Sequence, residues 1–183
     1  MRIDPIWMPD TQQLHFRLLL EAMARPGQIY PLAQLPQQGS VVLSVLSTLL
    51  DAEVSLADPH GLLNSGDWPM LQVKAAPAEL ADYVVCDAQH SPDFSPKLGT
   101  LPCPEQSATL ILLVDSLNDG NTHLQLSGPG IKTSTHLRIN GLNTSWLTKR
   151  EDWVCAFPLG ADLILVDPQH IAALPRTTRV EIM

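Results

Sequence analysis

Apolar residues recur at helical spacing in two segments near the start of the chain. In Thr11–Ala24 they return every three or four positions, Asp10 or Thr11 can cap the start, and Pro26 ends the pattern. Val41–Leu50 is more apolar still, because seven of its ten residues are Val or Leu. Most of the circumference of such a helix must be buried. The pattern therefore predicts two N-terminal helices, the second of them in the core.

Three hydroxyl residues interrupt the second segment on one side. Ser44, Ser47 and Thr48 follow the spacing i, i+3, i+4 and form a narrow polar stripe. Two roles are open for this stripe. It either allows close helix packing, with hydrogen bonds back to main-chain carbonyls, or it faces a ligand. We favour the packing role.

Beyond Asp51 the hydrophobic period shortens to that of β-strands. Turn residues separate the apolar runs, and the Asp119-Gly120 step predicts a hairpin between two of them. Thr144–Arg150 instead predicts a helix with Asn143 as its N-cap. The predicted strands are Glu53–Leu56, Leu71–Lys74, Asp82–Cys86, Thr109–Val114, Thr122–Leu126, Ile131–Ile139, Asp162–Val166 and Arg176–Ile182.

Two long segments carry neither period. Gln28–Gly39 is interpreted as a connector with a short extended piece around Tyr30. Asp87–Gln106 contains four prolines and is interpreted as an irregular excursion that is functional or forms an interface. No fixed-period repeat and no long linker divides the chain. We therefore expect one domain over residues 1–183, with an α/β fold in which helices flank a mixed sheet.

The composition is poor in charge for a folded domain. Charged residues make up 16% of the 183 residues, against about 25% in ordinary domains. A hydrophobic content of 45% excludes an intrinsically disordered chain. The net charge of −8 and the four scattered lysines argue against generic nucleic-acid binding, which needs clustered cations. Either another chain covers part of the surface, or polar uncharged residues cover it.

Sequence features of exported and membrane proteins are missing from the pattern. The first ten residues contain Asp4, Pro5, Pro9 and Asp10 and lack the apolar core of a signal peptide. The longest apolar run is about half of a membrane span. Cys86, Cys103 and Cys155 are odd in number and far apart, which matches neither a disulfide framework nor a paired-cysteine metal site. We expect a cytoplasmic protein that binds neither membrane nor nucleic acid.

No motif predicts an enzyme of a known catalytic type. The six histidines lack HxxxH and HExxH spacing, and no GxSxG or GxGxxG sequence occurs. Ser127–Gly130 resembles a phosphate loop superficially but is favoured as a Pro-Gly turn between strands. A pyridoxal phosphate enzyme needs a reactive lysine, for which Lys74 and Lys132 are the strand-associated candidates. The sequence therefore predicts no catalytic residue, no metal and no cofactor.

Five segments carry distinctive motifs, which are, in order along the chain, His15–Gly27 (HFRLLLEAMARPG), Ala108–Leu112 (ATLIL), Leu126–Ile131 (LSGPGI), Phe157–Leu165 (FPLGADLIL) and Leu174–Glu181 (LPRTTRVE). They span nearly the whole chain, although Glu53–Gln106 carries no such motif. In this order and spacing the segments resemble one protein family, the H subunit of the carbon–phosphorus lyase system. This system is the bacterial machinery for phosphonate use.

This resemblance implies an accessory subunit that works with the G, I and J subunits. The complex couples a phosphonate to the ribose of ATP and gives a ribosyl phosphonate triphosphate. The family is similar in fold to a reduced pyridoxal phosphate-dependent transferase, without that cofactor and without an identified catalytic residue. Isolated members form homodimers. Two alternatives stay open: an independent small enzyme, using pyridoxal phosphate or acting on a phosphorylated substrate, and a module that binds a nucleotide or phosphate.

Three arginines inside the matching motifs are the first candidate binding residues. Arg17, Arg25 and Arg176 carry guanidinium groups, which suit bidentate contact with phosphate or carboxylate. We favour the alternative, in which these arginines form ion pairs within the chain. The possible partners are Glu21, Asp162 and Glu181.

The C-terminal motif supplies the other candidate site residues. Gly160 is expected to shape the turn into the predicted Asp162 strand, and the Asp162 carboxylate to bind the backbone there. Thr177 follows Arg176 in a segment that lies either at an interface or at the mouth of a pocket. These residues complete the candidate binding or interface set.

Overall fold

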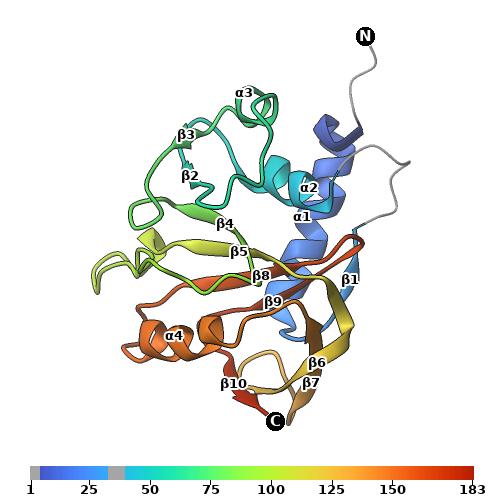
Figure 1. Cartoon of the computed structure of the whole chain (residues 1–183), viewed down its shortest axis with the longest axis vertical. Coiled ribbons are helices and arrows are strands. Elements are labelled where there is room, and N and C mark those ends of the chain that lie inside the picture. The colour runs from blue at the N-terminus through green and yellow to red at the C-terminus, as the bar shows by residue number, and fades with distance from the viewer. Residues whose placement is uncertain (1–4, 33–39) are drawn as a thin grey trace.

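A mixed sheet of seven strands forms the centre of the molecule (Figure 1). The structure is a computed structural model that describes residues 5–32 and 40–183. Strands β3, β2, β4, β5 and β8 run parallel, while β8, β9 and β1 pair antiparallel. From edge to edge the order is β1 (Tyr30–Pro31), β9 (His170–Leu174), β8 (Asp162–Val166), β5 (Thr109–Leu113), β4 (Tyr83–Asp87), β2 (Ser55–Ala57) and β3 (Lys74–Ala75).

A second, antiparallel sheet lies at the lower end of the molecule in Figure 1. Its central strand is the long β6 (Ser116–Ser127), which pairs with β10 (Arg179–Ile182) on one side and β7 (Thr135–Asn140) on the other. Leu124 and Leu126 of β6 are fully buried and join the core of the main sheet. The predicted α/β class with a mixed sheet is therefore confirmed.

Helices cover both faces of the main sheet, and strand β5 shows how the faces divide. Ile111 packs with the helices α1 (Pro9–Ala24) and α2 (Val41–Leu49), whereas its neighbours Leu110 and Leu112 pack with α4 (Ser145–Val154). This alternation follows from the two-residue period of a strand. None of the described helices is long and apolar enough to cross a bilayer. The short helices are η1 (Pro5–Trp7), α3 (Asp67–Leu71) and η2 (Pro104–Gln106).

The polar stripe of α2 makes the predicted hydrogen bonds to main-chain carbonyls. The Thr48 hydroxyl donates to the carbonyl oxygen of Ser44 at 2.7 Å, and the Ser47 hydroxyl donates to the same oxygen at 3.2 Å. The Ser44 hydroxyl donates in turn to the carbonyl oxygen of Ser40 at 3.4 Å. Ser44 and Ser47 are buried and Thr48 is half-buried. Because their hydroxyls bind main-chain carbonyls inside the protein, the packing role is confirmed.

Two predicted helix boundaries need correction. Helix α1 begins at Pro9, two residues before the predicted start, and no side chain caps it. Proline suits the first turn, because its fixed φ is helical and its missing N–H needs no partner there. Helix α4 continues to Val154, four residues beyond the predicted end. The N-cap is Thr144 rather than the predicted Asn143, but the Asn143 side-chain oxygen accepts the N–H of Ser145 at 3.0 Å.

The predicted strand Leu71–Lys74 is wrong for most of its length. Leu71 is the last residue of the short helix α3, and Gln72 then takes a left-handed conformation with φ of 55°. The Asp67 carboxylate accepts the N–H of Asn64 at 2.8 Å, which stabilises the turn into the helix. Strand β3 starts only at Lys74.

The predicted hairpin at Asp119-Gly120 is also wrong, because the chain does not reverse there. Asn118 (φ 74°) and Gly120 (φ 144°) belong to an irregularity inside β6, where the pairing with β7 shifts between Leu117 and Thr122. An added Cβ at Gly120 would lie 2.3 Å from the main-chain nitrogen of Asn140. Strand β5 lies in the seven-stranded sheet and β6 in the three-stranded sheet, so the two strands on either side of this step do not pair with each other.

The remaining segments agree with the pattern except at two strand starts and at the C-terminus. Strand β7 begins at Thr135, four residues after the predicted Ile131, and β2 begins at Ser55 rather than Glu53. Asp87–Gln106 is irregular apart from η2, and the connector contains the extended pair of β1, although its residues 33–39 lie outside the described residues. Strand β9 is missing from the predicted set, because His170–Leu174 contains two alanines and follows β8 after a short turn. The last strand starts at Arg179 rather than Arg176, since a turn from Pro175 to Thr178 precedes it.

His15 predicts a loss of stability in mild acid. It lies on α1 with 1% of its surface exposed, and its Nδ1 has no hydrogen-bond partner among the described residues. Burial lowers the pKa of His15, so the unfolded chain binds a proton that the folded chain does not. As the pH falls below about 6.5, the free energy of unfolding therefore falls, by at most about 1.4 kcal/mol per pH unit.

Urea unfolding at about pH 7.5 and about pH 5.5 measures this effect in the wild type and in His15→Leu. The wild type is expected to lose more stability between the two conditions than the variant, which has no imidazole to protonate. Equal losses in the two proteins would contradict the prediction.

Candidate functional site

A cavity of about 560 Å³ lies between α4 and the segment that joins β9 to β10. Its volume falls in the usual range for small-molecule sites. It includes two of the predicted site residues, Arg176 and Thr177, and is therefore the candidate functional site. We call it the arginine pocket. Its lining consists of Arg150, Glu151, Val154, Cys155, Phe157, Arg176, Thr177, Thr178, Arg179 and Val180.

Arg150 is the buried cation of the arginine pocket, with 2% of its surface exposed. Its Nη2 donates to the carbonyl oxygens of Pro175 and Thr178, at 2.6 and 2.9 Å. The N–H groups on Nε and Nη1 have no acceptor among the described residues. Burial lowers the pKa of Arg150 to about 10, against the opposite effect of Asp162 and Glu151. The guanidinium thus lies in the protein without a carboxylate in direct contact.

Arg176 differs from Arg150, because every N–H of its guanidinium has an acceptor. Its Nη2 lies 2.6 Å from Asp162 Oδ2, and its Nε lies 3.2 Å from the same oxygen. Its Nη1 donates to the carbonyl oxygens of Pro104 and Pro158, both at 3.1 Å, and Nη2 also donates to the Ser107 hydroxyl. The favoured ion pair with Asp162 is confirmed. Arg176 therefore joins three segments of the chain and has no donor left for a ligand.

Asp162, Gly160 and Thr177 lie beside Arg176. The Asp162 carboxylate accepts the main-chain N–H of Arg176 at 2.7 Å, as the predicted contact with the backbone requires. Gly160 has φ of 144°, and an added Cβ there would lie 3.2 Å from the carbonyl oxygen of Trp153 and 3.3 Å from Arg176 Cβ. Glycine thus lets the start of β8 approach the end of α4. Thr177 is exposed at the pocket.

The other two candidates are Arg17 on α1 and Arg25 at its C-cap, and α1 lies on the opposite face of the main sheet from α4. Arg25 forms an exposed ion pair with Glu21 at 3.1 Å, so the favoured alternative is confirmed for this residue as well. Arg17 is exposed and forms no ion pair with the described residues. The structure therefore brings four of the six candidates together and leaves these two apart.

Arg150, Thr178 and Arg179 line the pocket but are absent from the predicted site residues, although the Pro175–Thr178 segment was expected at an interface or at the mouth of a pocket. A signal existed for Arg150, because Trp146, Arg150 and Trp153 follow the spacing i, i+4, i+7 that marks the buried face of a helix. A cation at a core position of that pattern calls for an explanation. The two residues of the C-terminal motif carry no such signal, since their roles depend on how the turn after β9 meets α4.

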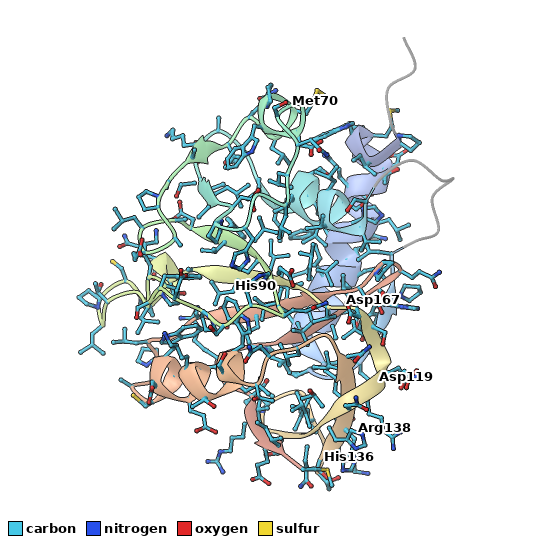
Figure 2. The ribbon with its side chains drawn as sticks, viewed as in Figure 1. Met70, His90, Asp119, His136, Arg138 and Asp167 are labelled. Carbon is cyan, nitrogen blue, oxygen red and sulfur yellow. The ribbon has the colours of Figure 1, made fainter. Side chains whose placement is uncertain are left out.

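A smaller cavity, of about 310 Å³, lies at the C-terminal ends of β5 and β8, where α/β sheets often bind ligands. Its acidic residue is Asp167, labelled in Figure 2. The Asp167 carboxylate already accepts the main-chain N–H groups of Leu117, Gln169 and His170. Burial raises the pKa of Asp167, but these hydrogen bonds outweigh it and hold the pKa below its usual value. Asp167 therefore stabilises the turn between β8 and β9.

The lysines considered for a Schiff base lie outside the arginine pocket. Lys74 is exposed on the edge strand β3, and Lys132 is exposed in the loop before β7. A third lysine, Lys97, is bound to Asp82. Among the described residues, no group of three His, Cys, Asp or Glu side chains is placed to hold a metal ion. The arrangement in the arginine pocket is suited to binding an anion rather than to proton transfer.

The chain matches the family model of the bacterial phosphonate metabolism protein (PhnH) over residues 6–181. It belongs to the PhnH family. A relative in Stutzerimonas stutzeri, the putative C-P lyase subunit protein HtxG, is 41% identical over 177 residues, which cover 97% of this chain and 89% of the relative. The alpha-D-ribose 1-methylphosphonate 5-triphosphate synthase subunit PhnH of Rhizobium meliloti (strain 1021) is 30% identical over 200 residues, covering 97% and 92%. The predicted resemblance is confirmed, and the PhnH match includes both α1 and the arginine pocket.

Proposed function

We propose that this chain is an accessory subunit of a carbon–phosphorus lyase complex in phosphonate catabolism. The observation that carries the proposal is the family match over nearly the whole chain, together with two relatives that are named as subunits of such systems. In this role the chain acts as one domain in the cytoplasm. It supports the formation of a ribosyl phosphonate triphosphate from ATP and a phosphonate without a catalytic residue of its own.

Exposed apolar side chains along α1 support the subunit role. Leu14, Phe16 and Leu20 are 47%, 47% and 53% exposed, and Arg17 is exposed among them. Single exposed apolar residues are ordinary, but several along one helix are typical of a surface that another chain covers. Leu101, 71% exposed in the proline-rich excursion, marks a second such place. The G, I and J subunits are the proposed partners, and a second copy of the chain takes their place in the isolated protein.

Co-expression with the G, I and J subunits, followed by size-exclusion chromatography, tests this proposal. The wild type is expected to elute with its partners, and a variant with Leu14→Gln and Leu20→Gln is expected to elute mainly alone. Leu80→Gln is the matched control, because Leu80 is 65% exposed but lies away from α1. A wild-type chain that elutes alone beside its partners would overturn the subunit role. If the double variant still co-elutes, the contact with the partner subunits lies elsewhere than on α1.

A second candidate function, the binding of a phosphorylated small molecule, is favoured by the unpaired guanidinium of Arg150 in the arginine pocket. The version that uses pyridoxal phosphate has less support, since Lys74 and Lys132 lie outside this pocket. Adding pyridoxal phosphate and recording the absorbance of an internal aldimine tests that version. The likeness to a reduced pyridoxal phosphate-dependent transferase stays a prediction of the family, with which a mixed sheet covered on both faces is compatible.

A further inference from the structure

The buried charge of Arg150 has no compensating charge in contact with it. A guanidinium taken out of water is unfavourable unless hydrogen bonds and an opposite charge replace the solvent. Arg150 donates to two neutral carbonyl oxygens through Nη2, which leaves three of its five N–H groups without an acceptor in the described part of the chain. Its side chain nevertheless lines a cavity large enough for a ligand. Nε is enclosed by the protein, but an anion in this cavity would supply the missing charge and acceptors for the N–H groups of Nη1.

Exposed groups of the lining extend the donor set of Arg150. The Thr177 hydroxyl is exposed at the cavity, whereas the Thr178 hydroxyl beside it is fully buried. Arg179 is exposed at the same cavity and forms no ion pair in the described part of the structure. Together these groups offer more donors than the two oxygens of a carboxylate use. They match the three acceptor oxygens of a phosphate-type anion.

Apolar side chains also line the arginine pocket. Phe157 is 69% exposed there, and Val154 and Val180 are half-buried. An exposed aromatic ring next to cationic groups is suited to a ligand with an anionic end and an organic end. The cavity of about 560 Å³ also exceeds what an inorganic anion alone would fill.

We infer that the arginine pocket binds a tetrahedral phosphorus oxyanion attached to an organic group. Arg150 and Arg179 contact the oxyanion, the hydroxyl of Thr177 adds a hydrogen bond, and Phe157 contacts the organic group. Phosphate esters and phosphonates share this chemistry. The inference rests on the second candidate function and not on the subunit role, so each can fail without the other.

Isothermal titration of the isolated chain with four probes tests the inference. Phenyl phosphate and phenylphosphonate present the same ring with and without a bridging oxygen, inorganic phosphate lacks the ring, and benzoate replaces the oxyanion by a carboxylate. Both phenyl compounds are expected to bind, with inorganic phosphate and benzoate each about tenfold weaker. Binding of only one phenyl compound would still support the site and would identify the source of the oxyanion.

Variants assign the binding to named residues. Arg179→Gln is expected to weaken phenyl phosphate binding about tenfold, because it removes a charge-assisted contact. Arg138→Gln is the matched control: Arg138 is exposed on β7, at the lower right of Figure 2, whereas α4 lies at the lower left. Phe157→Ala is expected to weaken phenyl phosphate but not inorganic phosphate. Arg150→Lys keeps the charge but loses the planar fork, and about a tenfold loss is expected here as well.

Two results would overturn the inference. The first is a wild-type chain that binds none of the three phosphorus compounds at millimolar concentration. The second is equal affinity for phenyl phosphate in Arg179→Gln and Arg138→Gln. This comparison decides the matter even if Arg150→Lys does not fold, because Arg179 and Arg138 are both exposed. A chain that fails here and still co-elutes with its partners would leave the subunit role intact.

Discussion

Asp162→Ala is expected to lower the free energy of unfolding by about 3 kcal/mol. The Asp162 and Arg176 side chains are each only 16% exposed, and the Asp162 carboxylate accepts hydrogen bonds from the Arg176 side chain and from its main-chain N–H. Alanine would leave a mostly buried guanidinium without its counter-charge. The cost is larger than the worth of the pair itself, because the remaining charge stays in a poorly solvated place.

Urea unfolding measures this change as a shift of the midpoint at an unchanged slope. Glu21→Ala is the control, because it breaks the Arg25–Glu21 pair, whose side chains are 63% and 47% exposed. An exposed pair contributes at most about 1 kcal/mol. If the two variants shifted the midpoint equally, the Asp162–Arg176 pair would have no special structural role.

Trp146→Ala is expected to be the most destabilising single substitution proposed here, at about 4 kcal/mol. Trp146 is fully buried on α4, and its ring lies edge-on to Phe94 and Trp153, with centroids 6.1 and 6.4 Å away. Its Nε1 donates to the carbonyl oxygen of His90 at 2.6 Å. Alanine would leave a large cavity and an unpaired carbonyl where α4 packs on the sheet.

Thermal and urea unfolding should both show this loss, and Leu80→Ala, at a 65% exposed position, should change either midpoint little. Because α4 carries Arg150, the folded fraction of Trp146→Ala is also expected to bind phenyl phosphate more weakly. A destabilisation below about 1 kcal/mol would show that the site repacks and that Trp146 does not hold α4 in place.

Sequence reasoning found the elements whose pattern is local and continuous. Strand β8 has the predicted bounds, Asp162–Val166, because five consecutive apolar-rich residues between turns leave few alternatives. Strand β9 was hidden, since a run with two alanines becomes a strand only when β8 and β1 lie beside it. The turn signal at Asp119-Gly120 was real in its backbone conformation, yet it produced a bulge rather than a hairpin. Tertiary pairing, which no short window contains, made the difference.

For the candidate site, too, contacts within one motif could be predicted from the sequence and contacts between distant segments could not. Arg176 and Asp162 could be paired from their place in the C-terminal motif, since acids and arginines in one motif often bind each other. The partners of Arg150 could not be predicted in this way, because they are the main-chain carbonyls of Pro175 and Thr178, which any residue could supply. The sequence motifs therefore indicated Arg176, whose N–H groups all have acceptors, and not Arg150, which has N–H groups without an acceptor among the described residues. The low charge of the chain also gains meaning, because two of its few cations line one pocket without a carboxylate in contact.

A pairing between segments far apart in the sequence fixes when folding can be completed. Strand β1 pairs with β9, α1 packs on β9, and the main-chain N–H of Leu32 donates to the carbonyl oxygen of Gln169 at 2.9 Å. During synthesis α1 leaves the ribosome long before β9 does. Until then the apolar residues of α1 that belong to the core are open to other chains. The main sheet is therefore closed only after β9 has been made, and a chain that stops before His170 has no native place for α1.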